Sequence, residues 1–154
     1  MTRRFCWALG LMMVLATIST PAYAQLKGGV HAGVSGGPTQ FVFGGHVETK
    51  EIVDHLTFRP SVDFGVGNGG TIVGFNIEFA YWLPAKTDPW KFYLGAGPAA
   101  NVVHTDAFGT DLFGGFNLLA GVLHESGLFV EMKGGIADSP DFKLLVGWQF
   151  KSKK

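Results

Sequence analysis

Apolar and polar residues alternate along most of this chain, so that every second residue is apolar. Eight such runs cover residues 26–34, 41–47, 56–66, 73–81, 90–102, 112–122, 128–132 and 142–150. A period of two is typical of β-strands with two different faces, and no stretch of useful length has the spacing of an amphipathic helix. Turn signals such as Gly36-Gly37-Pro38 and Ser139-Pro140-Asp141 separate the runs. The pattern therefore predicts eight strands joined by short connections.

The length of each repeat indicates how these strands are arranged. About 16 residues are available for each strand and its turn, and a tilted strand needs about 9–11 residues to cross a bilayer. Consecutive strands with short connections form an antiparallel meander, and closing it removes the edges that would otherwise recruit other chains. The sequence therefore predicts an all-β protein, an eight-stranded antiparallel up-and-down barrel.

The first 24 residues have a different pattern, that of a secretory signal peptide. Arg3 and Arg4 give a positive start, residues 5–18 are mostly apolar, and Ala22-Tyr23-Ala24 is an A-x-A cleavage site. We therefore divide the chain into a cleaved signal peptide, residues 1–24, and a barrel domain, residues 25–154. The single cysteine, Cys6, lies in the removed part, so disulfides do not hold the barrel together.

The position of the charges separates two proteins of opposite design that share such a barrel. A soluble carrier of the lipocalin type has an apolar interior and charges outside, whereas a membrane barrel has the reverse. Glycine and asparagine are common on the polar parity, which suits a narrow, packed interior. The charged residues within the runs all have this parity: Glu48, Arg59, Asp63, Glu78, Lys91, Glu131, Lys133 and Lys143.

These charged residues predict a network of ion pairs in the lumen of a transmembrane barrel. Four are acidic and four are basic, and such a balance is expected inside because an isolated buried charge costs several kcal/mol. Arg59 is the only arginine after the signal peptide, and its planar fork is expected to bridge Glu78 and Glu48. A soluble periplasmic barrel that binds an apolar ligand remains the first alternative.

Aromatic positions and composition favour the membrane interpretation. Tyr81, Trp82, Trp90 and Trp148 lie near strand ends, where the interfacial girdles of membrane barrels form. Only 16% of the residues are charged, 47% are hydrophobic, and 12 basic residues balance 12 acidic ones. This composition excludes disorder, and the lack of a basic stripe excludes nucleic acid as a partner.

The last part of the chain resembles a known family. The segment Gly127 to Lys133, the turn Asp138 to Asp141 and the segment Phe142 to Phe150 look like the last hairpin of small bacterial outer membrane β-barrel proteins. These are similar to the transmembrane domain of outer membrane protein A. The resemblance implies an outer-membrane location, with membrane lipids as partners.

The same resemblance implies an assembly signal. In such proteins the barrel assembly machinery recognises the final strand, with its alternating apolar residues and terminal aromatic. The matching residues here are Phe142, Leu144, Val146, Trp148 and Phe150. The tail Lys151-Ser152-Lys153-Lys154 differs from the family, which usually stops at the aromatic residue.

Few side chains carry a chemical signal. If the first hairpin turns through residues 36–40, His31 and His46 lie directly opposite each other and share a face with Glu48, a possible set of three zinc ligands. We favour polar lining of the lumen instead. His124-Glu125-Ser126 resembles the His-x-Ser spacing of outer-membrane lipid A deacylases, but it falls in a tight turn on the side of the chain termini.

The sequence therefore predicts no catalytic residue, no metal and no cofactor. We expect a small integral outer-membrane barrel with a plugged, charged lumen and a structural or interaction role. An outer-membrane lipid-modifying enzyme remains the second alternative.

Overall fold

A computed structural model describes residues 26–67, 70–85, 87–105 and 109–151. The predicted signal peptide, residues 1–24, lies outside the described residues. The strands are β1 (Lys27–Gly36), β2 (Gln40–Glu48), β3 (Glu51–Val53), β4 (Leu56–Gly67), β5 (Gly70–Trp82), β6 (Trp90–Thr105), β7 (Gly109–His124), β8 (Leu128–Ala137) and β9 (Phe142–Gln149). No helix among the described residues is long and apolar enough to cross a membrane.

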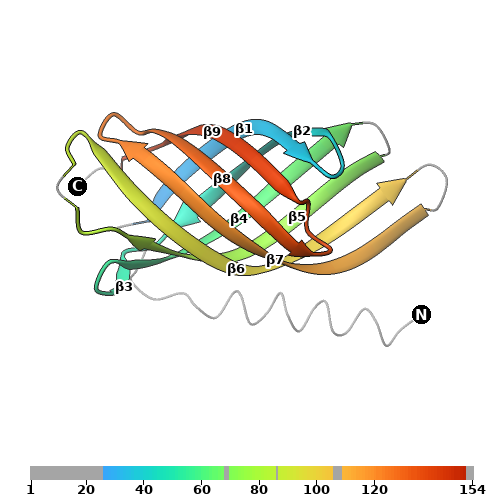
Figure 1. Cartoon of the computed structure of the whole chain (residues 1–154), viewed down its shortest axis with the longest axis horizontal. Helices are drawn as coiled ribbons and strands as arrows, with labels where there is room; N and C mark the ends of the chain where they lie inside the picture. Colours follow the sequence, from blue (N-terminus) through green and yellow to red (C-terminus); the bar gives the residue numbers. More distant parts are fainter. Residues whose placement is uncertain (1–25, 68–69, 86, 106–108, 152–154) are drawn as a thin grey trace.

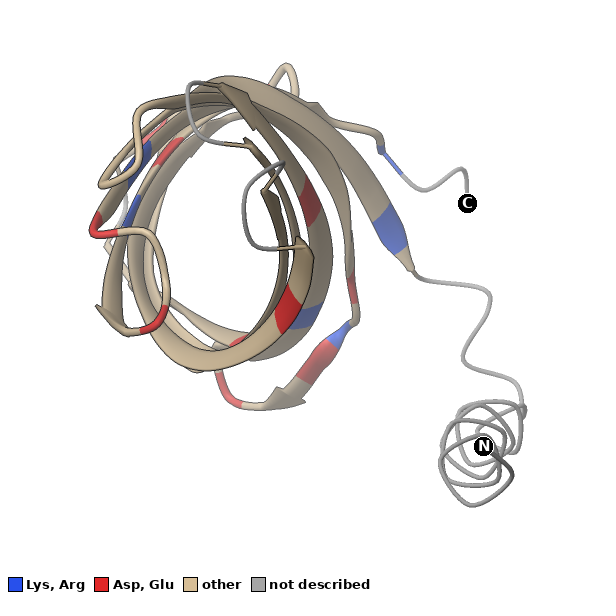
Figure 2. Cartoon of the chain, turned by 90° about the vertical axis from the view of Figure 1, so that its right-hand side faces the viewer, with Lys and Arg blue, Asp and Glu red and all other residues tan. Residues whose placement is uncertain are grey.

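Eight of these strands close into a barrel (Figure 1). The order in the sheet is β2-β1-β9-β8-β7-β6-β5-β4, and β4 also pairs with β2, so the sheet returns to its start. Each neighbouring pair is antiparallel. Figure 2 looks along the barrel and shows the ring. The prediction of an eight-stranded up-and-down barrel is confirmed.

The short strand β3 was not predicted. It follows β2 after a bend and pairs with the first residues of β4, Glu51 opposite Thr57. The three residues of β3 are all exposed. They extend the sheet at one end of the barrel and do not form a ninth barrel strand, because β2 itself pairs directly with β4.

The barrel has two different ends. The terminal end holds the start of β1 and the end of β9, together with the connections from β2 to β4, β5 to β6 and β7 to β8. The hairpin end holds the turns between β1 and β2, β4 and β5, β6 and β7, and β8 and β9. The hairpin of β6 and β7, with 16 residues in each strand, extends farthest at that end (Figure 1).

Alternate residues of each strand point to opposite sides of the wall. On β5, Phe75 and Ile77 are 49% and 52% exposed, whereas Asn76 and Glu78 between them are 2% and 1% exposed. The same alternation runs around the barrel, so the outer face is apolar and the lumen is mostly polar. The apolar parity therefore faces outward, as predicted, which is the reverse of a soluble protein.

The register of the first hairpin differs from the expectation. His31 lies opposite Gly44 and His46 opposite Gly29, so the two histidines are diagonal neighbours rather than direct partners. The cause is the turn: Ser35 already pairs with Gln40, and the Ser35 hydroxyl donates to the Pro38 carbonyl across it. The turn is therefore centred one residue earlier than predicted, which keeps both imidazoles on the inner face.

Candidate functional site in the lumen

The lumen brings together seven of the eight charged residues predicted for it. They come from five strands, and all are buried: Glu48, Arg59, Asp63, Glu78, Glu131, Lys133 and Lys143. The alternation of each strand points them inward, and the opposite walls of a barrel of this size are close enough for them to meet. They form three groups along the barrel axis.

The central group is built around Lys133 of β8. Its Nζ donates to both carboxylate oxygens of Glu78 on β5, at 3.0 and 2.9 Å, and lies 3.6 Å from Glu131. Asn117 of β7 donates to Glu78 at 3.1 Å and to the side chain of Asn76 at 2.8 Å. Charge-assisted hydrogen bonds of this kind are stronger than neutral ones, so the group ties β5, β7 and β8 together across the lumen.

Arg59 lies on the terminal side of this group and does not have the predicted partners. Its side chain crosses the lumen and pairs with Glu131, which also accepts the Tyr93 hydroxyl at 2.7 Å. The guanidinium carbon lies 5.0 Å from the Tyr93 ring centre and 5.4 Å from that of Phe129. The expected bridge to Glu78 and Glu48 was wrong, although Arg59 and Glu78 are partners in the backbone register. The two rings form a slot beside Glu131 that suits a planar cation.

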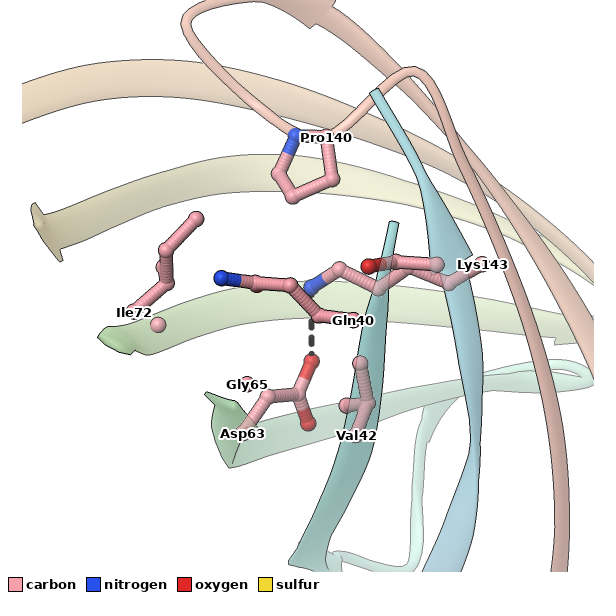
Figure 3. Close-up of a pocket in the computed structure, with 9 residues that line it drawn as sticks. Gln40, Val42, Asp63, Gly65, Ile72, Pro140 and Lys143 are labelled. Atoms are coloured by element: carbon pink, nitrogen blue, oxygen red, sulfur yellow. Dashed lines mark hydrogen bonds and ion pairs between the residues drawn. The ribbon is translucent and has the colours of Figure 1, made fainter. Parts of the chain in front are cut away.

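Asp63 is the centre of the group toward the hairpin end (Figure 3). It accepts from Lys143 at 2.9 Å and from Asn76 at 3.2 Å, and His31 Nε2 lies 2.8 Å from its other oxygen. Beside it is a cavity of about 10 Å³, lined in part by Gln40 and Pro140. This volume is about the size that a single water needs.

The third group lies at the terminal end of the barrel and is centred on Glu48. Its carboxylate accepts from the Thr57 hydroxyl at 2.7 Å, the Trp82 indole N–H at 2.8 Å and the side-chain amide of Gln149. Among the described residues no lysine or arginine lies within ion-pair distance of it. Neutral donors from β4, β5 and β9 therefore satisfy this buried carboxylate.

Lys91, the remaining predicted member, is not part of the network. It is exposed and makes none of the ion pairs found among the described residues. It has inward parity, but it is the second residue of β6, at the terminal end, and Tyr93 is the first buried residue of that strand. Parity alone did not indicate where the filled part of the lumen stops.

Several residues that fill the lumen were not identified from the sequence. Tyr93 and Phe129 are bulky residues on the polar parity and are almost completely buried. Trp82, expected in an outer girdle, turns inward to Glu48. A signal was available in the neighbouring glycines: a Cβ at Gly121 would collide with the Tyr93 ring, and one at Gly147 with the Phe129 ring.

The candidate metal and hydrolytic residues have other roles. His31 contacts Asp63, and His46 lies 3.3 Å from an Arg59 nitrogen; no group of three potential metal ligands occurs among the described residues. His124 Nδ1 lies 2.8 Å from the Ser126 hydroxyl and accepts the Ser126 backbone N–H at 3.1 Å. This imidazole thus stabilises an exposed turn at the terminal end.

The predicted assembly residues form one outward-facing row on and just after β9. All five are exposed: Phe142, Leu144, Val146, Trp148 and Phe150. The inward residues of the same strand, Lys143 and Gln149, join the lumen groups of Asp63 and Glu48. The last strand therefore contributes to both faces of the barrel.

A closed eight-stranded antiparallel barrel with an apolar outer face and a charged, packed lumen has the architecture of the small transmembrane β-barrels. Among solved structures, the chain is similar to the N-terminal β-barrel domain of Pseudomonas aeruginosa OprF, with a TM-score of 0.63 and 15% identity over 82% of this chain and 98% of that one. It is also similar to Neisserial surface protein A (NspA), with a TM-score of 0.62 and 15% identity over 82% of this chain and 94% of that one. No protein-family model and no curated protein matches the sequence. The resemblance to small outer-membrane barrels is thus confirmed at the level of the fold.

Proposed function

We propose that this protein is a small integral outer-membrane barrel with a structural or interaction role and no catalysis. The observation that carries the proposal is the apolar outer face, which every strand of the barrel contributes to. It includes Phe41 and Phe43 of β2, near the start of the barrel, and Leu144 and Val146 of β9, its last strand. Such a surface is favourable in hydrocarbon and costly in water.

Membrane fractionation tests this location directly. Cells that express the full chain are lysed, and their membranes are washed with urea, which removes peripheral proteins. We expect the protein to stay in the outer-membrane pellet and to migrate differently on gels with and without heating, as closed membrane barrels do. Release by urea, together with the same mobility in both lanes, would contradict the proposal and favour the soluble carrier.

The lumen supports a barrel that is plugged rather than porin-like. The three charged groups lie along the axis, and the cavity beside Asp63 and Lys143 has only about 10 Å³. The same packing leaves no room there for an apolar ligand of a carrier. In planar bilayers we expect no steady large conductance from the intact protein, whereas a steady conductance of porin size would contradict a plugged lumen.

We also propose that the outward row of β9 is the signal read by the barrel assembly machinery. Trp148 and Phe150 lie on its outer face near the end of the strand, and Lys151 follows directly. Phe150→Ser should reduce the amount of barrel in the outer membrane, whereas Lys151→Ser should not.

The proposed absence of lipid-modifying activity has its own test, a comparison of the lipid A mass between a deletion strain and its parent. An altered mass would contradict the proposal.

A further inference from the structure

One segment of the barrel wall has a free edge. The ladder between β7 and β8 begins at Gly115 opposite Ala137, although β7 itself begins at Gly109. Residues Gly109–Gly114 pair with β6 on one side, and no described strand pairs with them on the other. Alternate backbone N–H and C=O groups of such a segment point toward a missing neighbour.

The chain turns away from this edge at Ala137. Ala137 has a φ of 62°, a left-handed conformation that is uncommon for a residue with a Cβ. Beyond it, Asn101 of β6 donates to the Asp138 carbonyl at 3.0 Å, and Ser139 is buried. The turn from β8 to β9 is therefore folded toward the lumen, and it leaves the place beside Gly109–Gly114 open.

The free edge lies beyond the part of β7 that spans the wall. The ladder with β8 uses Gly115 to Leu123, and a bilayer needs about 9–11 residues of a tilted strand. Unpaired backbone groups are not tolerated in hydrocarbon, which also places this edge outside the membrane. Lipid is therefore not its partner.

The edge lacks most of the features that normally prevent strand addition. Its sequence contains no lysine and no proline, and Asp111 is its one charged residue. Leu112 is 72% exposed on the outer face and Phe113 is 38% exposed on the inner face. A strand placed beside it would contact apolar side chains on both faces and extend the sheet in line with β8.

We infer that the edge Gly109–Gly114 is a docking site for an extended segment of another polypeptide, which adds to β7 as an antiparallel strand. The segment would carry apolar residues on both faces and a lysine or arginine opposite Asp111. A second copy of this chain does not fit. Two barrels in one membrane have the same orientation, so their β7 strands run in the same direction and cannot pair antiparallel. This exclusion of a second copy, like the exclusion of lipid, rests on the proposed membrane location.

The test uses the full protein, purified in detergent, and a labelled peptide. The probe is fluorescein-Gly-Gly-Thr-Val-Ile-Lys-Val-Thr-amide, which in antiparallel register places its lysine opposite Asp111. The matched control has the same side chains but N-methyl groups on alternate residues, which remove half of the backbone donors. We expect saturable binding by fluorescence anisotropy, at least about tenfold weaker for the N-methylated peptide, because main-chain hydrogen bonds supply the affinity in strand addition.

A charge exchange tests the register. The variant Asp111→Lys should bind the lysine peptide about two- to fivefold more weakly, the size of an exposed ion pair, and should bind a glutamate peptide better than the parent does. Equal binding of the probe peptide and its N-methylated control would show that the peptide binds only through its side chains or through detergent. This result would overturn the inference. Peptide-free dimers, captured by cross-linking a Leu112→Cys variant, would overturn it in favour of a second copy. Urea extraction of membranes tests the proposed membrane location, and fluorescence anisotropy tests peptide binding. The two experiments are independent, so a failure of one proposal can be distinguished from a failure of the other.

Discussion

The outer face and the lumen of this barrel are made by alternate residues of the same strands, yet they are stabilised in different ways. On β5, Phe75 and Phe79 point outward and are 49% and 40% exposed. Glu78 points inward and has two specific donors, Lys133 and Asn117. In the proposed membrane location, the cost of a change on the outer face should therefore be the free energy of transferring the new side chain into lipid. The cost of a change in the lumen should be the free energy of leaving its partner buried without a counterpart.

The largest effect is expected from Arg59→Ala. Removing this side chain leaves Glu131 without its guanidinium partner and empties the slot between Tyr93 and Phe129. Breaking a buried ion pair in this way costs about 3–5 kcal/mol. The measurement is the midpoint of unfolding in urea for the protein reconstituted in lipid vesicles.

Arg59→Lys is the matched variant for that measurement. It keeps the charge but loses the planar fork and the stacking, so its midpoint should lie between those of Arg59→Ala and the parent. If Arg59→Ala unfolds at the same midpoint as the parent, then the lumen groups do not stabilise the barrel and the contrast between the two faces fails.

On the outer face, Phe75→Lys should be the most damaging type of change. Phe75 lies near the middle of β5, and a lysine facing lipid at the bilayer midplane costs about 2–4 kcal/mol. We expect less folded protein in vesicle insertion, scored by the shift in gel mobility on heating. Phe75→Leu keeps an apolar residue at the same position and should insert as the parent does. Normal insertion of Phe75→Lys would indicate that this face does not contact lipid.

The fold could be predicted from the sequence because alternation is a local signal. Each barrel strand found by pattern is present, and the outward parity is correct on all of them. The register of the first hairpin was not predictable in the same way, since it depends on whether Ser35 and Gln40 pair across the turn. A shift of this kind moves partners along the axis but leaves every side chain on its own face.

The contacts inside the lumen were less predictable because they join strands that are far apart in sequence. Arg59 and Glu131 meet across the barrel, and no spacing along the chain indicates this pair. Charge parity correctly placed seven ionisable residues inside, but it included Lys91, since parity does not indicate depth along the axis. The partners of Glu48 were missed because they are neutral donors rather than cations.

A smaller effect is expected from Trp82→Phe at the terminal end. The change removes the indole N–H that donates to the buried carboxylate of Glu48, which leaves Thr57 and Gln149 as donors. A lost hydrogen bond to a buried charged group costs about 1–3 kcal/mol. Trp148→Phe on the outer face is the control, and it should change the unfolding midpoint much less. Equal shifts for the two variants would indicate that Glu48 does not depend on its indole donor.

The smallest effect is expected from Lys91→Ala, and it tests where the lumen ends. Lys91 shares the inward parity of Lys143, but it is exposed and unpaired among the described residues, whereas Lys143 is buried against Asp63. Substitutions at exposed sites without specific partners usually change stability by less than about 0.5 kcal/mol. In the same urea titration, Lys91→Ala should therefore unfold as the parent does, whereas Lys143→Ala should unfold at a clearly lower midpoint. If Lys91→Ala lowers the unfolding midpoint as much as Lys143→Ala does, then the charged network extends to the terminal end. Inward parity alone would then decide which charged residues stabilise the barrel.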